Sequence, residues 1–550
     1  TKLTDFYSSS PVCSPSRAAL LTGRFQTRTG IWPGVFVADS VGGLPSSEIT
    51  IAQFLKMNDL NYSTAIVGKW HLGTGGESGS YLPTNRGFDF YTGIPYSHDM
   101  PDPPYCFPEK RGCWPATAID PWNDTCPDSY NAENFVHIDE ATADWSYDPV
   151  ATAQALEYKR RYLRDKHIFE RMNPGQKYRI PVELRRSENV YYEDNVAATS
   201  PPLPLYWNTE IIQQPVNITM VPSFYTEAAL SFINQSVSNE QKFFLYMAFH
   251  QTHHPQFASS MFFNTSQRGM FGDAEAEMDY NLGRIMSYLK QIGVDKETFV
   301  FFSSDNGPSL TRETRGGNAG ALKCGKGTTY EGGQRVPGIA WMPNYIESGR
   351  VTRQMGSTLD MFPTVAELVD KPIPSDRYYD GYSMYDWLFS KGGKSKRNTF
   401  YYWPKDPSPS KGWQQSLHAV RVNQWKLHWI VGGSHCQNYY KDPDCRANAT
   451  ETILKNPILF NLYQDVSEAY PPNISEPYYA NIVQQVNKSW DYILNTQGLW
   501  GESEINKGQS DAYGPCCNWN CTNNWPSCCD CDKINNTANP LRYIYDRFFS

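Results

Sequence analysis

The sequence predicts an α/β protein with a large, mostly parallel sheet flanked by helices, plus a smaller C-terminal domain with an antiparallel sheet and a cysteine-rich tail. Short apolar runs alternate with helical patterns along most of the 550 residues. Three of these runs, at 62–67, 242–249 and 298–304, end in polar loops. Because open parallel sheets bind ligands at the C-terminal ends of their strands, these loops are candidate site segments. The run FFLYMAF within 242–249 is expected to be a buried strand.

Later parts of the chain indicate a second domain. A helical pattern at 359–370 precedes a loop-rich stretch, and residues 417–430 alternate in hydropathy at period two, which is typical of antiparallel strands. We therefore expect a catalytic domain at 1–390 and a C-terminal domain at 391–550. Residues 127–200 differ in pattern and are interpreted as an insertion. Their basic stretch favours a solvated amphipathic helix, with a polyanion-binding patch as the alternative.

Composition narrows the class of protein. The formal net charge of −8 gives no indication of a nucleic-acid partner, and no apolar run approaches the about 18 residues of a membrane span. Six of the 13 cysteines lie within 516–531, a stretch without histidine, which favours disulfides over zinc. The chain opens on Thr1 rather than Met, so we expect a missing or processed N-terminus. N-x-S/T sequons also favour an oxidising compartment; they lie at Asn61, Asn123, Asn217, Asn234, Asn264, Asn448, Asn473, Asn487, Asn520 and Asn535.

The stretch SPVCSPSR places a cysteine at the start of a predicted helix. We expect Ser14 to be the N-cap and Pro15 the first helical residue. Cys13 would then lie just ahead of the helix N-terminus, where the helix dipole favours negative charge, and Arg17 would lie one turn inside. This arrangement indicates an anion pocket that holds a reactive atom. The alternative is a disulfide cysteine in front of a capped helix.

Other polar motifs also stand at strand ends. Asp305 and Asn306 of DNGP offer hard oxygen ligands suited to Ca²⁺ or Mg²⁺, or form an ordinary turn. Residues 320–333 nearly match a P-loop, but Gly327 stands where Ser or Thr is needed, so we reject nucleotide binding and keep Lys326 as an anion clamp. Histidines in these loops favour general acid–base chemistry over zinc binding; they are His71, His98, His250, His253 and His254.

Taken together, six motifs resemble the sulfatase family: CSPSRAALLTGR, GKWHLG, GIPYSHD, THHPQF, SSDNGP and CGKGTTYEGG. The resemblance implies an alkaline-phosphatase-like fold and hydrolysis of sulfate monoesters. In this family the signature cysteine is oxidised to formylglycine, and the aldehyde is hydrated to a geminal diol. One hydroxyl attacks sulfur to give a covalent sulfo-enzyme, and deprotonation of the second expels sulfate. A thiolate attacking sulfur would instead leave a stable ester and an inactive enzyme.

The resemblance also implies a role for each matching residue. Cys13, as formylglycine, is the nucleophile and a metal ligand, and Arg17 holds its hydroxyl. The remaining implied roles are orientation and deprotonation of the diol by Lys69 and His71; binding of Ca²⁺, with Mg²⁺ as the alternative, by Asp305 and Asn306; sulfate binding and assistance to the leaving oxygen by His253 and Lys326; and sulfate contacts from Ser97 and Lys69. Such a cluster of cations would stabilise the charge of the transition state.

The family pattern carries further expectations. It implies a disulfide between Cys324 and Cys445, a lysosomal or secreted location, maturation by a formylglycine-generating enzyme, and a homodimer. The family's Asp-Asp metal pair on a preceding strand does not occur ahead of Cys13, so we expect that strand to be missing. The substrate would be a sulfated small molecule, glycolipid or glycan. The alternatives are a phosphonate or phosphate ester hydrolase on the same fold, and a non-catalytic pseudo-sulfatase that binds sulfated glycans.

Overall fold

A computed structural model describes residues 1–549 apart from 59, 101–201, 255, 311–315, 412–415, 433–444, 446–450, 497, 520–527 and 535–539. The insertion predicted at 127–200, with its basic stretch, lies outside the described residues. So do four of the sequons, at Asn123, Asn448, Asn520 and Asn535.

The first sheet has six strands in the order β15-β5-β4-β3-β2-β6. They are β2 (Tyr62–Gly68), β3 (Phe90–Gly93), β4 (Leu205–Trp207), β5 (Glu210–Gln214), β6 (Lys242–Ala248) and β15 (Cys531–Asp532). β2 runs parallel to both β3 and β6, whereas β4 is antiparallel to β3 and β5. Because only two residues join β4 to β5, this pair can only be an antiparallel hairpin.

The second sheet has five strands, with β10-β1-β8-β7 in a row and β9 paired to β1. They are β1 (Lys2–Tyr7), β7 (Val300–Ser303), β8 (Arg335–Trp341), β9 (Val351–Thr352) and β10 (Gly356–Ser357). β8 is antiparallel to β1 and β7. The α/β fold class is therefore confirmed, although strand pairing in the large domain is mixed rather than mostly parallel.

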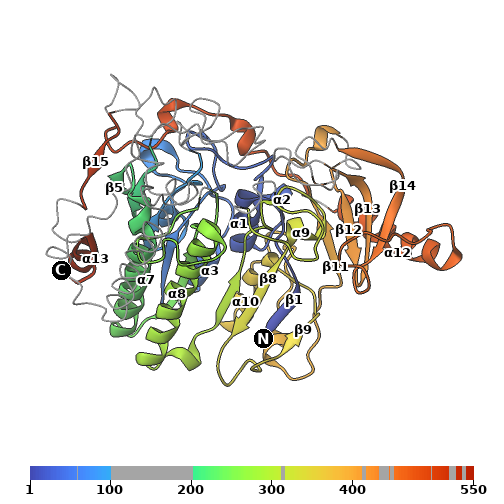
Figure 1. The fold of residues 1–550 in the computed structure, drawn as a ribbon, viewed down its shortest axis with the longest axis horizontal. Coiled ribbons are helices and arrows are strands. Elements are labelled where there is room, and N and C mark those ends of the chain that lie inside the picture. The colour runs from blue at the N-terminus through green and yellow to red at the C-terminus, as the bar shows by residue number, and fades with distance from the viewer. Residues whose placement is uncertain are drawn as a thin grey trace, which may run out of the picture.

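Helices cover both faces of these sheets (Figure 1). The longer ones are α1 (Cys13–Thr22), α3 (Ile51–Met57), α7 (Val221–Ser238), α8 (Gly269–Gln291), α10 (Met361–Leu368) and α13 (Pro540–Phe549); the short ones are α2 (Gln26–Thr29), α9 (Glu331–Gln334) and α11 (Tyr385–Phe389). α7 and α8 lie side by side and pack against one face through Phe243, Leu245 and Met247 of β6. Phe244, which points the opposite way along the strand, packs against α3 and α10.

The C-terminal part of the chain forms an antiparallel sheet beside the large domain, at the right of Figure 1. Its order is β11 (Thr399–Tyr402), β12 (Ala419–Val422), β13 (Trp425–Val431) and β14 (Thr452–Asn461), with α12 (Pro477–Leu494) packed on it. The antiparallel pair expected at 417–430 is confirmed as β12 and β13. The chain then returns to the large domain, where β15 pairs with β5 and α13 packs on α7.

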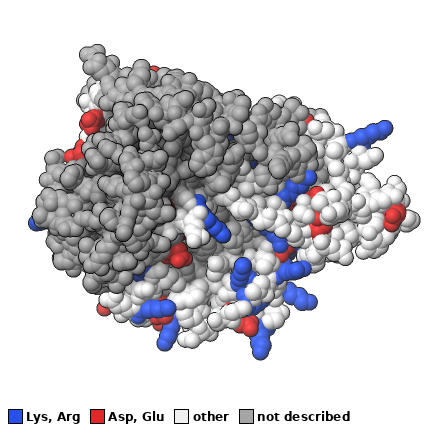
Figure 2. All heavy atoms as spheres, viewed as in Figure 1, with Lys and Arg blue, Asp and Glu red and all other residues white. Residues whose placement is uncertain are grey.

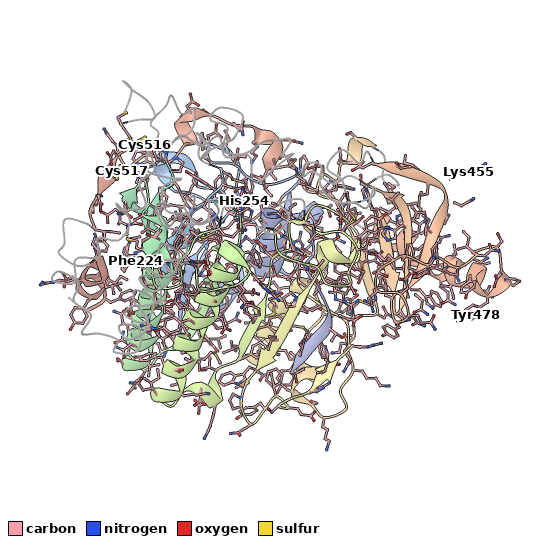
Figure 3. All side chains as sticks on the ribbon, viewed as in Figure 1. Phe224, His254, Lys455, Tyr478, Cys516 and Cys517 are labelled. Carbon is pink, nitrogen blue, oxygen red and sulfur yellow. A yellow bond between two sulfur atoms is a disulfide. The ribbon has the colours of Figure 1, made fainter. Side chains whose placement is uncertain are left out.

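Disulfides join distant parts of the chain. The expected bond between Cys324 and Cys445 is present. In the tail, Cys516 pairs with Cys529 and Cys517 with Cys531; Figure 3 labels Cys516 and Cys517 near β15. Within the described residues, Cys13 is the one free cysteine, so the disulfide alternative for this position is wrong.

In the described part of the face seen in Figure 2, acidic and basic side chains are interspersed. None of the helices in the described ranges has the length and apolarity needed to cross a bilayer.

The run FFLYMAF, expected to be a buried strand, does form β6, but β6 is only half-buried over Phe243 to Met247. β6 is the last strand of the six-stranded sheet, and β7 is the last strand of the five-stranded sheet. A cavity of about 1840 Å³ lies between these two edges and is lined by both strands. Residues of α7 and α8 line it on one face, and residues of α3 and α10 on the other.

Candidate active site

The predicted site residues gather where β2, β6 and β7 end and α1 begins. Close backbone contact between β2 and β6 sets the position of Lys69. At Gly68, which has φ +118°, a Cβ atom would lie 2.1 Å from the Ala248 carbonyl oxygen, so only glycine fits. The next amide, that of Lys69, then donates a hydrogen bond to the same carbonyl. His254, labelled in Figure 3, belongs to the loop that follows β6.

α1 begins at Cys13, so the expected cap at Ser14 and first helical residue at Pro15 are wrong. Val12 is the N-cap and makes no side-chain cap hydrogen bond. The Ser14 hydroxyl instead accepts a hydrogen bond from the Phe36 amide, so a tertiary contact has taken the group expected to cap the helix. Cys13 therefore lies in the first helical turn, still at the positive end of the helix dipole.

The Cys13 thiol is buried and has polar groups on several sides. Its Sγ atom lies 3.5 Å from Lys69 Nζ, 3.6 Å from Lys326 Nζ and 3.5 Å from Asn306 Oδ1. Burial raises the pKa of the thiol, but Lys326 and Lys69, together with hydrogen bonding to His253 and His71, lower it well below the ordinary value. The site is therefore built to hold negative charge at the atom of residue 13.

Arg17 joins α1 to the end of β7. Its guanidinium lies 2.8 Å from Asp305 Oδ2 and donates a 2.7 Å hydrogen bond to the Lys69 carbonyl oxygen. It also donates to the Tyr246 hydroxyl at 3.4 Å. Arg17 thus lies beside the reactive residue, as predicted, but its strongest contacts fix the loops around Cys13.

His71 is held as a neutral ring. Its Nε2 donates to the Phe36 carbonyl oxygen at 2.8 Å, which leaves Nδ1 as the acceptor of the ring. Burial, and after it the nearby Lys69 ammonium, lower the pKa of His71 to about 4, although hydrogen bonding with Cys13 acts in the opposite direction. Above that pH, His71 can accept a proton.

A second pair of residues lies on the opposite side of the thiol. Lys326 Nζ is 2.8 Å from His253 Nε2, and His253 Nδ1 donates to the His254 carbonyl oxygen at 2.6 Å. The carbonyl can only accept, so Nδ1 carries the proton and Nε2 accepts from the Lys326 ammonium. Ser97 is also in the cluster, because its hydroxyl accepts a 3.0 Å hydrogen bond from Lys69 Nζ.

The site offers the type of ligand atom that a divalent cation requires, but too few of these atoms. Asp305 and Asn306 supply hard oxygen atoms next to residue 13, as Ca²⁺ or Mg²⁺ requires. About six oxygen ligands are usual. No cluster of three or more His, Cys, Asp or Glu side chains suited to a metal occurs within the described ranges.

Sequence reasoning missed Asp99 and Tyr246. Asp99 Oδ1 lies 3.9 Å from His253 Nδ1; burial raises the pKa of Asp99, but His253, His98 and Lys326 lower it well below the ordinary value. The position of Asp99 in the loop after PYSH was the available signal. Tyr246 could have been found from its alternation along β6, which turns it toward α1 rather than α7.

Comparisons of the sequence with known proteins identify the family of this chain. The family model described as sulfatase matches residues 1–371, and the model described as the C-terminal region of aryl-sulfatase matches residues 395–531. Arylsulfatase A of Homo sapiens is 33% identical over 535 residues, covering 96% of this chain and 88% of that protein. N-acetylgalactosamine-6-sulfatase of Canis lupus familiaris is 30% identical over 498 residues, covering 88% and 76%.

The similarity extends to solved structures. The PsFucS1 sulfatase from Pseudoalteromonas sp. has a TM-score of 0.63 at 23% identity, over 91% of this chain and 83% of its own. The sulfatase model thus matches more than half of the chain, and arylsulfatase A of Homo sapiens is 33% identical over 96% of it. The chain therefore belongs to the sulfatase family and is a sulfuric ester hydrolase.

Proposed function

We propose that this enzyme hydrolyses sulfate monoesters with residue 13 in the formylglycine form. The observation that carries the proposal is the position of Cys13 Sγ within 3.6 Å of Lys69, Lys326 and Asn306, in a buried site at a helix N-terminus. As the hydrated aldehyde, residue 13 supplies a hydroxyl that attacks sulfur and a second hydroxyl whose deprotonation expels sulfate. The family match supports this chemistry.

The surrounding residues bind the sulfate, accept the proton of the diol and assist the leaving group. Lys69 and Lys326 lie on two sides of residue 13 and hold the sulfate oxygens, and Ser97 is kept within reach by Lys69. Neutral His71 accepts the proton of the diol, because its pKa of about 4 leaves it unprotonated at higher pH. His253 Nε2 accepts a hydrogen bond from the Lys326 ammonium, and the proton that these two residues share passes to the leaving oxygen of the ester.

The direct test combines mass spectrometry with two variants. The Cys13 peptide of the enzyme from a secretory host should show formylglycine. Cys13→Ala should lose turnover of 4-nitrophenyl sulfate by about 10⁶-fold or more, because no other residue supplies the diol. Cys13→Ser should release one equivalent of phenol and then stall as a sulfo-enzyme, because a single hydroxyl attacks but does not eliminate.

Thermal unfolding of both variants serves as the control and should match the parent. Steady multiple turnover by either variant would contradict the mechanism. A preference of the parent for phenyl phosphonate over 4-nitrophenyl sulfate would instead support the alternative hydrolase, and binding of a sulfated glycan without any turnover would support the pseudo-sulfatase.

Asp305, Asn306 and residue 13 are proposed to hold Ca²⁺, or Mg²⁺, which would polarise the sulfate ester. Further carboxylates are needed, and the cavity between β6 and β7 supports a source for them. Both strands end at the site, so a parallel strand inserted between them would also end there. We propose that the cavity receives an apolar N-terminal strand that ends in an Asp pair, completing one catalytic domain over 1–390 ahead of a C-terminal domain at 391–550.

The substrate is proposed to be a sulfated sugar, glycolipid or small aryl ester, since the relatives are named for arylsulfatase and N-acetylgalactosamine-6-sulfatase activity. Passage through the secretory pathway to a lysosomal or secreted location, with maturation by a formylglycine-generating enzyme and assembly as a homodimer, belongs to the same proposal. The disulfides seen among the described residues, together with exposed sequons at Asn61, Asn264 and Asn473, support that route.

A further inference from the structure

Behind the site, a row of buried hydrogen bonds ends at the backbone of His253. The Tyr225 hydroxyl on α7 lies 3.3 Å from His250 Nε2. His250 Nδ1 lies 3.1 Å from His98 Nδ1, and His98 Nε2 lies 3.1 Å from the carbonyl oxygen of His253. None of these three side chains is more than 3% exposed. The roles proposed above use none of them.

The acceptor at the end of this row fixes the direction of every bond. A carbonyl only accepts, so His98 Nε2 must carry a proton. With a neutral ring, His98 Nδ1 is then an acceptor, and His250 Nδ1 must donate to it. A neutral His250 in turn has its lone pair at Nε2, so the Tyr225 hydroxyl donates. All the donors therefore point from α7 toward His253.

The surroundings favour a neutral His250 ring. Burial lowers the pKa of His250 well below the ordinary value, and His98, Lys69 and Arg17 lower it further. The backbone of Ile94 makes a hydrogen bond to the Tyr225 oxygen, which leaves the hydroxyl proton for His250. A proton added to His98 would go to Nδ1 and place two donors against each other at the 3.1 Å contact with His250. A proton added to His250 would go to Nε2, which faces the donating Tyr225 hydroxyl.

We infer that Tyr225, His250 and His98 are positioning residues, which hold the backbone of His253 so that its Nε2 stays at Lys326 and at the leaving oxygen of the ester. This inference rests on the proposed role of His253. The ring of His98 also contacts the ring of His253, with centroids 5.4 Å apart.

The test compares two esters that differ in their need for help at the leaving oxygen. Phenolate is a poorer leaving group than 4-nitrophenolate, so phenyl sulfate depends more on His253 than 4-nitrophenyl sulfate does. Tyr225→Phe should lower kcat/KM for phenyl sulfate about tenfold and for 4-nitrophenyl sulfate about threefold or less. A general loss of folded enzyme would lower both equally and leave their ratio unchanged.

Two substitutions of His98 test its two hydrogen bonds one at a time. His98→Gln keeps a donor near the position of Nε2 and thus the bond to the His253 carbonyl, whereas His98→Asn keeps only a polar group near Nδ1. We expect His98→Asn to lose about a hundredfold on phenyl sulfate and His98→Gln clearly less. Tyr91→Phe is the matched control: it removes another buried tyrosine hydroxyl, on β3, outside the row.

An unchanged ratio of the two esters in Tyr225→Phe, or a smaller loss in His98→Asn than in His98→Gln, would overturn the inference. A shift of the ratio in Tyr91→Phe as large as in Tyr225→Phe would also overturn it. Failure of the proposed function would appear differently, as a parent enzyme without sulfate ester turnover. If Tyr225→Phe does not fold, as judged by thermal unfolding, the pair of His98 variants decides the question.

Discussion

Glu277 on α8 is a carboxyl group whose protonation depends on its burial. Only 2% of the residue is exposed, and its Oε2 accepts a hydrogen bond from the Ser259 amide. Burial, with a smaller contribution from neighbouring Asp273, raises the pKa of Glu277 to about 7. The hydrogen bonds from Ser259 act in the opposite direction. The group is therefore protonated in the folded enzyme at pH values where the unfolded chain has already lost the proton.

This difference gives a stability that changes with pH. An unfolded glutamate titrates near pH 4.3, so both states are protonated below that value. Between about 4.3 and 7 only the unfolded state ionises, and stability falls by about 3 kcal/mol as pH rises through this window. Glu277→Gln should remove this slope, as measured by urea unfolding at pH 5 and pH 7.5, whereas exposed Glu275→Gln on the same helix should keep it. Equal slopes in parent and Glu277→Gln would contradict the assignment.

At the scale of elements, the edge strands β6 and β7 differ in burial from a strand that is covered on all sides. Central strands covered by helices on both faces are normally buried, but these two strands are half-buried along their length. Apolar side chains of four helices line the cavity between them. This apolar lining suits one more strand, which is the strand proposed above to bring an Asp pair to the site.

Extending the chain tests that proposal. Thr1 would be joined through a flexible linker to an apolar seven-residue segment that ends in two aspartates, with an otherwise identical segment ending in two asparagines as the control. Both extensions should raise the melting temperature, because both bury the edges of β6 and β7. Only the aspartate version should bind Ca²⁺ tightly in calorimetry, because Asp305 and Asn306 provide too few oxygen ligands. Equal Ca²⁺ affinity of both extensions and the parent would contradict the proposal.

At the scale of the whole molecule, a buried charge network joins the two domains. Glu331 on α9 accepts hydrogen bonds from Tyr7 of β1 and Tyr402 of β11, both at 2.7 Å, and from Lys426 of β13 at 3.1 Å. Lys426 also lies 3.0 Å from Glu468. Burial raises the pKa of Glu331, but Lys426 and other cations lower it well below the ordinary value, so the carboxylate stays ionised.

Removing Lys426 should take the shared ammonium from two buried carboxylates, which then keep Arg335 beside Glu331 and His428 beside Glu468. Lys426→Met is expected to destabilise the enzyme by about 3–5 kcal/mol, as measured by urea unfolding. Lys396→Met is the control, since the side chain of Lys396 is 58% exposed and its pair with Asp386 is worth less than about 1 kcal/mol. Similar losses in the two variants would show that the network contributes no more than a surface ion pair.

The sequence by itself determined the family, the α/β class and the strand ends that carry the chemistry. These follow from local patterns: the period of apolar residues, and motifs whose residue types the chemistry requires. It also gave the disulfide of Cys324 through family resemblance. Such features are encoded over a few residues or in fixed motif positions.

Only the tertiary structure decided the rest, because it depends on contacts between residues far apart in the chain. The Phe36 amide donates a hydrogen bond to the Ser14 hydroxyl, so Ser14 does not cap α1, and the helix begins at Cys13. The half-buried state of β6 reflects what lies beside its edge, which hydropathy does not record. The direction of the hydrogen bonds from Tyr225 to His253 needed both ends of the row in place, since a histidine's tautomer is set by its partners.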